Sequence, residues 1–245
     1  MSNLIKSPVE QKKIRAKKEK DILYFSLDDR YTKVSVLASF LAMTPNGVQR
    51  ILRSMQSKEL IKVHKVDVPL NPRKVSIWGL TPTGAALVTP DNEPLRFFEV
   101  GRLKSITMKH SLDLQHVKAI LLREGWGEWQ SSSKMLRRAN LERSKWRQVP
   151  DAFAISPEGR KIAIELERSI KTPKRYVEIL ENYAEMISSE VVEEVFYFCP
   201  DNLEERLKSM FYRIEKIIFK GKVVQVHESL LKRFHFISYD VKTFK

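Results

Sequence analysis

The chain has 245 residues and a formal net charge of +14, with 44 Lys and Arg residues against 30 Asp and Glu residues. A hydrophobic content of 42% with eight glycines is typical of a folded protein and excludes a disordered basic tail. The single cysteine, Cys199, excludes an intramolecular disulfide and a multi-cysteine zinc site, and no uncharged run reaches the roughly 18 residues of a membrane helix. Both halves of the chain are basic, so we expect a cytoplasmic protein without membrane insertion that binds a polyanion such as DNA.

Residues 1–20 contain the basic run QKKIRAKKEK, which we interpret as an N-terminal arm. This run is either a solvated helix extension or an arm that contacts phosphates. In both cases we expect it to add non-specific affinity for DNA.

Three helical patterns follow, over residues 22–27, over 33–42 and from Thr44 onward, and two strands are predicted over 60–66 and 75–80. The third helix has an outer face of residue types suited to base edges and phosphates, namely Asn46, Gln49, Arg50 and Arg53. Arg73 and Lys74 lie at the far side of the loop between the strands. This order predicts a winged helix-turn-helix DNA-binding domain over residues 21–88, and the alternative is a polar-faced helical bundle with no nucleic-acid role.

The proline-rich stretch around residues 90–94 marks a composition break, and we predict a linker over 89–105. A helix is predicted from Ile106 to Arg123. It carries His110 and His116, whose spacing of six residues does not place both on one helical face, so we interpret them as unlinked histidines rather than a zinc pair. Asp113 lies between them as a weak candidate for an additional ligand.

A strand is predicted over residues 126–131, and a basic cluster follows between residues 134 and 147. The cluster is either a solvated loop face or a surface that contacts the DNA backbone. Its cations are Lys134, Arg137, Arg138, Arg143, Lys145 and Arg147.

Residues 151–155 and 161–167 alternate apolar and polar side chains around a turn that contains Pro157 and Gly159, which predicts a β-hairpin. A symmetric five-residue loop pairs Ile155 with Lys161 and therefore brings Asp151 opposite Glu165, on the same face. Glu167 follows two residues later and shares that face. Three converging carboxylates require a compensating cation, and hard oxygen ligands favour Mg²⁺ or Mn²⁺. The alternative is an exposed strand whose outer face carries acids.

An amphipathic helix is predicted from Pro173 to about Ser188, with Thr172 as its N-cap. Lys171, Lys174 and Arg175 surround its first turn. Cations there oppose the helix dipole, but they suit a site where an anion such as phosphate docks. A carboxylate cluster beside such a helix start is typical of a metal-dependent phosphodiesterase.

The last part of the chain predicts a buried strand over 195–199, a helix from Asp201 to about Ile218, and strands over 223–226 and 235–241. The predicted nuclease domain therefore runs from 106 to 245 in the order α-β-β-β-α-β with a C-terminal extension. The strand at 195 would run parallel to the second hairpin strand through a right-handed crossover.

This order, with Pro150-Asp151 followed by Glu165-Leu166-Glu167, resembles the restriction-endonuclease-like fold, of mixed α/β or α+β class. Its motif is proline-aspartate followed by (Asp or Glu)-x-Lys, and here Glu167 replaces the lysine. The resemblance implies Asp151, Glu165 and Glu167 as metal ligands. Because this lysine is missing, the attacking water would be activated by Glu167 itself or by a displaced lysine, Lys171 or Lys174.

A winged helix in front of such a nuclease resembles the replication-relaxation family, and in particular the MobC-type relaxases of mobilisable plasmids. The resemblance implies a metal-dependent endonuclease that binds a plasmid transfer origin and nicks one strand for conjugative mobilisation. Further partners would be an accessory mobilisation protein and a coupling protein. Tyr176 could be a nucleophile or a packing residue, and we favour packing. The other hypotheses are a restriction or repair nuclease that cuts both strands, and a DNA-binding replication or transcription regulator with a degenerate nuclease fold.

Overall fold

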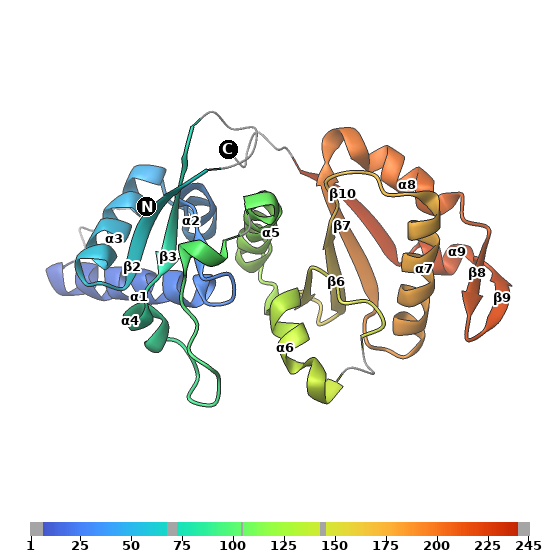
Figure 1. Ribbon diagram of the computed structural model, residues 1–245, viewed down its shortest axis with the longest axis horizontal. Helices are drawn as coiled ribbons and strands as arrows, with labels where there is room; N and C mark the ends of the chain where they lie inside the picture. Colours follow the sequence, from blue (N-terminus) through green and yellow to red (C-terminus); the bar gives the residue numbers. More distant parts are fainter. Residues whose placement is uncertain (1–6, 68–72, 104, 143–145, 240–245) are drawn as a thin grey trace. The chain divides into compact units, whose positions relative to one another are not determined.

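The computed structural model describes residues 7–67, 73–103, 105–142 and 146–239. The chain forms two compact units, Met1–Ala119 and Ile120–Lys245, and each is described by itself. Both contain helices and sheets, so the fold class is mixed α and β (Figure 1).

Unit 1 has the element order predicted for a winged helix. Three helices, with the two-residue strand β1 between the first and the second, precede β2, β3 and a short helix, and the three strands form an antiparallel sheet of order β1-β3-β2. The elements are α1 Pro8–Ser26, β1 Tyr31–Thr32, α2 Val34–Leu41, α3 Pro45–Ser57, β2 Ile61–Val66, β3 Val75–Leu80 and α4 Pro82–Ala86.

Two threonine caps and one glycine explain the boundaries of unit 1. The side chain of Thr44 accepts a hydrogen bond from the Gly47 amide and starts α3, and Thr81 does the same for Gly84 at α4. Gly84 is needed because a Cβ atom at this position would lie 1.9 Å from the Leu60 carbonyl oxygen. The helix α4 therefore packs directly on the backbone that leads into β2.

Two segments that flank the predicted winged helix are part of unit 1. The basic run is helical from Pro8 onward, as in the helix-extension alternative, and forms the largely exposed N-terminal part of α1, which begins at a capping box of Ser7 and Glu10. The predicted linker is docked, because the Phe98 amide donates to the Leu80 carbonyl at 2.8 Å and its ring packs over Gly79. A short 3₁₀ helix, η1 Val100–Arg102, follows it.

The helix α5, Ser105–Arg123, crosses the boundary between the units. The sequence placed this helix in the second domain, whereas its residues up to Ala119 belong to unit 1. Their polar side chains are buried there: Gln115 donates to the Tyr31 carbonyl at 3.1 Å, and the Lys118 ammonium donates to the Phe25 carbonyl at 2.8 Å. Polar groups need partners when they leave water, and these bonds tie α5 to unit 1.

Unit 2 is built on a five-stranded sheet of order β10-β7-β6-β5-β4. β4, β5 and β6 pair antiparallel, and β7 is parallel to both β6 and β10, so the predicted parallel crossover through α7 is present. The elements are β4 Gly127–Ser131, α6 Ser132–Glu142, β5 Ala152–Ile155, β6 Lys161–Leu166, α7 Pro173–Ser188, β7 Glu194–Pro200, η2 Asp201–Leu203, α8 Glu204–Tyr212, β8 Lys216–Phe219, β9 Lys222–Gln225, α9 Glu228–Leu231 and β10 Phe234–Tyr239.

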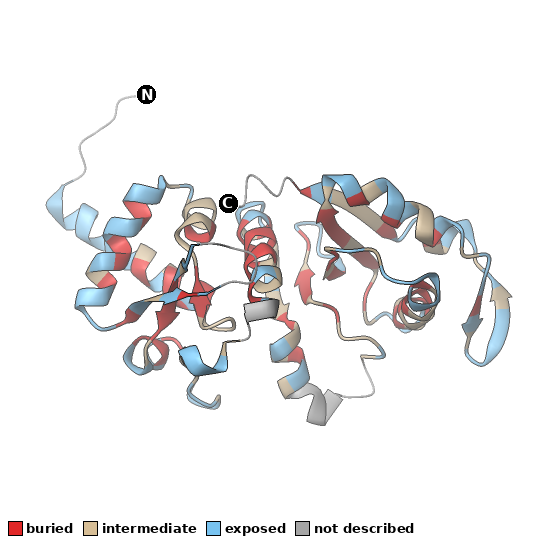
Figure 2. Ribbon diagram, turned by 45° about the horizontal axis from the view of Figure 1, so that its top comes forward, coloured by how far each residue is buried: buried red, intermediate tan, exposed pale blue. Residues whose placement is uncertain are grey.

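The core of unit 2 lies between one face of this sheet and the helices α7 and α8 (Figure 2). Large aromatic side chains fill it, among them Tyr176, Tyr183, Tyr197, Phe211 and Phe234. Ring centroids of Tyr197 and Phe211 lie 5.2 Å apart, a distance typical of packed aromatic pairs.

Two predicted elements of unit 2 are wrong. Part of the basic cluster at 134–147 is helical, because Ser132 to Glu142 form α6. The helix after Asp201 ends at Tyr212, and the apolar run that seemed to continue it forms β8. In the part of the chain that the structure describes, no helix is long and apolar enough to cross a membrane.

Candidate active site and nucleic-acid interface

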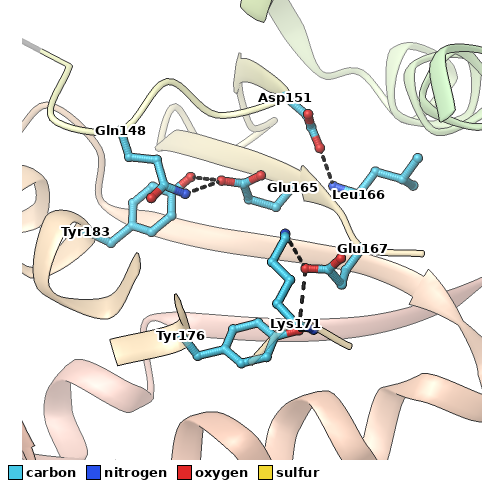
Figure 3. Close-up of polar contacts among 8 residues, drawn as sticks. All are labelled: Gln148, Asp151, Glu165, Leu166, Glu167, Lys171, Tyr176 and Tyr183. Atoms are coloured by element: carbon cyan, nitrogen blue, oxygen red, sulfur yellow. Dashed lines mark hydrogen bonds and ion pairs between the residues drawn. The ribbon is translucent and has the colours of Figure 1, made fainter. Parts of the chain in front are cut away.

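The register of the hairpin β5–β6 is the predicted one. Ile155 pairs with Lys161, and the ladder continues to Ala152 opposite Ile164. One further step brings Asp151 beside Glu165. The Leu166 amide donates to Asp151 Oδ2 at 2.8 Å, which fixes this carboxylate at the end of the two strands (Figure 3).

Glu165 is held by two side chains from outside the hairpin. Tyr183 of α7 donates its hydroxyl to Glu165 Oε1, and Gln148 Nε2 donates to the same oxygen at 2.8 Å. Glu165 also lies opposite Tyr197 in the parallel pair β6–β7. The carboxylate therefore belongs to the sheet face that α7 covers, and not to an exposed strand surface.

The environment of Glu165 favours its protonated form. Burial, followed by the negative charge of Asp151, raises the pKa of Glu165 to about 7, against the opposing effects of its two hydrogen bonds and of Lys171. When both carboxylates are ionised, their negative charges repel each other. A bound cation would offset this repulsion.

Glu167 is engaged separately. Its buried carboxylate pairs with Lys171 Nζ at 2.5 Å and accepts a longer contact from the Tyr176 hydroxyl at 3.5 Å. Lys174 is exposed on the first turn of α7, where Arg175 pairs with Glu178 at 3.0 Å. The structure thus brings Asp151 and Glu165 together and places Glu167 with Lys171, not with Lys174.

Tyr176 occupies a packing position. Its side chain is fully buried, its ring lies 5.3 Å from that of Phe211, and its hydroxyl accepts a hydrogen bond from the Lys171 amide at 3.0 Å. Burial raises the pKa of Tyr176 to about 12. A phenolate nucleophile is therefore disfavoured here.

The oxygen atoms beside Glu165 suit a hard divalent cation in their chemistry. Within the described ranges, Gln148 Oε1 and the Tyr197 hydroxyl are buried and have no hydrogen-bond partner. Amide and carboxylate oxygens are the ligands that Mg²⁺ and Mn²⁺ prefer. Asp151, Glu165 and Gln148 therefore fit such an ion, although among the described side chains no group of three or more His, Cys, Asp or Glu residues is arranged to hold one.

Sequence reasoning did not single out Gln148, Tyr183 or Tyr197 as site residues. One signal was available for Tyr183, because it lies seven residues after Tyr176 and so shares its face of α7. Gln148 lies in a loop, and Tyr197 meets Glu165 only through the parallel register. Neither position follows from local sequence.

The face of α3 that is predicted to contact DNA is exposed. All four predicted residues on it, Asn46, Gln49, Arg50 and Arg53, point to solvent. We call the antiparallel strands β2 and β3 the wing. A shallow hollow of about 570 Å³ lies between α3 and the wing, lined by Gln49, Arg53, Gln56, Ser57, Val63 and Trp78. Arg73 and Lys74 are exposed directly before β3, and Lys74 Nζ lies 3.3 Å from an Asp67 oxygen.

The basic cluster of unit 2 is only partly described. Arg137 of α6 is half-buried and donates to Ser133 Oγ at 3.1 Å, and Arg147 pairs with Glu185 of α7 at 2.5 Å. The side chain of Arg138 lies outside the described residues, as do residues 143–145. The cluster therefore includes cations that also stabilise unit 2 itself.

Two solved structures show limited similarity to this chain. A transcriptional regulator homologue from Pyrococcus horikoshii OT3 is 22% identical over 31% of this chain and 79% of its own, with a TM-score of 0.24. A mutant of ZitR from Lactococcus lactis in its apo form is 15% identical over 56% of this chain and 84% of its own, with a TM-score of 0.26.

No curated protein matches the chain. The family model described as replication-relaxation matches residues 28–197, which include α2, α3 and the wing of unit 1 and extend through the hairpin and α7 into β7 of unit 2. The match covers well over half of the sequence, and the chain belongs to the replication-relaxation family.

Proposed function

We propose that this protein is a metal-dependent DNA endonuclease that nicks one strand at a plasmid transfer origin for conjugative mobilisation, as MobC-type relaxases do. Unit 2 would be a restriction-endonuclease-like catalytic core, and unit 1 a winged helix that selects the site. The observation that carries the proposal is the Asp151–Glu165 pair, in which burial and mutual repulsion hold the pKa of Glu165 at about 7.

The residues around this pair have distinct roles in the proposal. The Leu166 amide orients Asp151, and Tyr183 and Gln148 orient Glu165, so the two carboxylates are held before any ligand arrives. Bound Mg²⁺ or Mn²⁺ would polarise the scissile phosphate and lower the pKa of the attacking water.

Glu167 would act through Lys171. The lysine ammonium remains half exposed while its pairing with the buried Glu167 fixes its position. An ammonium held in this way can contact a phosphate oxygen. In this proposal Lys171 would replace the lysine that the restriction-endonuclease-like motif has two residues after its second acid.

Unit 1 would supply recognition. The exposed side chains of α3 match base edges and phosphates, and the basic wing adds backbone contacts. A coupling protein and an accessory mobilisation protein would complete the assembly in the cytoplasm.

The proposal is tested on supercoiled plasmid that carries the transfer origin, with and without Mn²⁺. Wild type should yield open-circular DNA, and Glu165→Gln should lower the nicking rate at least a hundredfold, because the amide has nearly the same shape but cannot supply a negative ligand. Binding measured in EDTA should be unchanged. The matched control is Glu205→Gln, which removes an exposed acid of α8 and should nick at the wild-type rate. Nicking by Glu165→Gln at the wild-type rate would overturn the proposal.

One observation favours a second candidate, a DNA-binding regulator with a degenerate nuclease fold. Glu167 is neutralised by Lys171 and does not join Asp151 and Glu165 as a third ligand. In that case wild type would bind specifically and give no cleavage with either metal. Linear product would instead indicate a double-strand nuclease of the restriction or repair type.

A further inference from the structure

The hairpin β8–β9 forms a separate two-stranded sheet on the outer side of α7 (Figure 1). Its four pairs run from Lys216 opposite Gln225 to Phe219 opposite Lys222, so the loop is only Lys220-Gly221. We call residues 216–225 the basic ribbon. It lies beyond residue 197, where the family match ends.

The two faces of the basic ribbon differ. Ile217 is buried, and Val224 and Phe219 pack beside it against the core of unit 2. Opposite pairs share a face, so the outer face carries Ile218 and Val223, which are 54% and 71% exposed. These two residues form a small apolar pair on the side of the ribbon that faces away from the core.

Charge identifies the kind of partner. The ribbon contains three exposed lysines and no acid, and exposed Gln225 shares the outer face with Ile218 and Val223. Positive side chains are not required to bind an apolar surface. They are, however, attracted to the negative phosphates that border a DNA groove.

The tip of the ribbon adds an independent indication. Lys220 and Gly221 both have positive φ, 49° and 77°, as a two-residue type I′ turn requires. Asn, Asp or Gly is favoured at the first of these positions, and a lysine there is less favourable than any of the three. The strained position holds a long, exposed cation at the most protruding point of the hairpin.

We propose that the basic ribbon is a second DNA-binding element, which enters the major groove of duplex DNA next to the nicking site. A two-stranded ribbon fits this groove. Lys216 on the outer face and Lys220 at the tip contact phosphates, Ile218 and Val223 meet apolar groups such as thymine methyls, and Gln225 reaches an adenine edge. The inference rests on the proposed function in taking DNA as the substrate.

The attachment of the ribbon to α7 gives it a fixed relation to the carboxylates. The Ile218 amide donates to Glu181 of α7 at 2.7 Å, and Tyr183, two residues later, bonds to Glu165. Two residues along a helix correspond to 200°, so the ribbon and the carboxylates lie on opposite sides of one helix. DNA bound to the ribbon would therefore be held in constant register with the nicking site.

The test measures binding of the full chain to a fluorescent duplex of about 40 base pairs in EDTA, over a range of salt concentrations. Lys216→Gln with Lys220→Asn removes two charges while Asn suits the turn, so thermal stability should be kept or raised. The salt slope of log K should fall by about 1.8, and affinity near 0.1 M salt by roughly tenfold per lysine. Ile218→Thr with Val223→Thr should weaken binding several-fold at an unchanged slope.

The matched control is Lys208→Gln, which removes an exposed lysine of α8 and should leave affinity and slope at wild-type values. If both ribbon variants bind like wild type while Arg53→Gln binds more weakly, the ribbon is not a DNA contact and the inference is overturned. The assay requires no cleavage, so a failure of the nicking proposal would leave its result unaffected.

Discussion

At the scale of single residues, the surroundings of Glu165 show which parts of the site can be predicted from the sequence. The hairpin turn fixed its neighbour Asp151, because the length of the loop sets the register of the strands. Its partners Tyr183 and Gln148 come from elsewhere in the chain, and only tertiary packing brings them to the carboxylate. Burial and the charge of Asp151 raise the pKa of Glu165, whereas the hydrogen bonds from Tyr183 and Gln148 oppose that rise.

The pKa of Glu165 predicts how stability depends on pH. Its folded-state value of about 7 lies above the ordinary value of 4.5, so the folded state binds this proton more tightly than the unfolded state does. The contribution is present below pH 4.5 and is lost as the pH rises through 7. In Glu165→Gln the loss is absent, and the free energy of unfolding of this variant relative to wild type should rise by about 3 kcal/mol between pH 4.5 and 8.

The measurement is urea unfolding of both proteins in EDTA across this pH range. Glu205→Gln serves as the control, because it makes the same substitution at an exposed carboxyl of α8. A difference between Glu165→Gln and wild type that stays constant with pH would contradict the prediction.

At the scale of elements, α7 organises unit 2. Its start was predictable from Thr172 and Pro173, and its apolar periodicity gave its buried face. Shorter elements were not predictable in the same way. β1 has only two residues, α6 is rich in arginine and serine, and the apolar run of β8 reads equally well as a continuation of α8. Their conformations depend on neighbouring strands and helices.

Two lysines near the start of α7, which the sequence could not distinguish, have different surroundings in the structure. Lys171 lies in the loop before the helix and pairs with buried Glu167, whereas Lys174 is exposed on the first turn. Lys171→Gln should reduce nicking by at least tenfold and lower stability by about 1 kcal/mol, because it leaves Glu167 without its cation. Lys174→Gln should nick within about twofold of wild type.

Single-turnover nicking rates and thermal unfolding of the two variants provide the comparison. Lys171→Arg is informative as well, since it retains the charge and should recover part of the activity. Equal effects of Lys171→Gln and Lys174→Gln would show that the contact with Glu167 has no role in the reaction.

At the scale of the whole molecule, the sequence predicted two functional parts but misplaced the border between them. A composition break near Pro90 suggested a linker, yet that segment docks on unit 1 through Phe98, and α5 follows it as far as Ala119. The cause is a set of buried polar contacts, such as Lys118 with the Phe25 carbonyl, that hydrophobic periodicity does not reveal. Under the proposed function, recognition and chemistry would nevertheless belong to separate compact units.

This division predicts that recognition and catalysis can be impaired independently. Arg53→Gln removes an exposed cation of α3 in unit 1, and should weaken binding to transfer-origin DNA by about 1–3 kcal/mol. Once the variant is saturated with DNA, its nicking rate should equal that of wild type, because Asp151 and Glu165 in unit 2 are unchanged. Glu165→Gln should show the opposite behaviour, with normal binding and no nicking. Nicking rates over a range of protein concentrations separate the two effects, and a slow rate for Arg53→Gln even at saturation would mean that α3 also contributes to the chemical step.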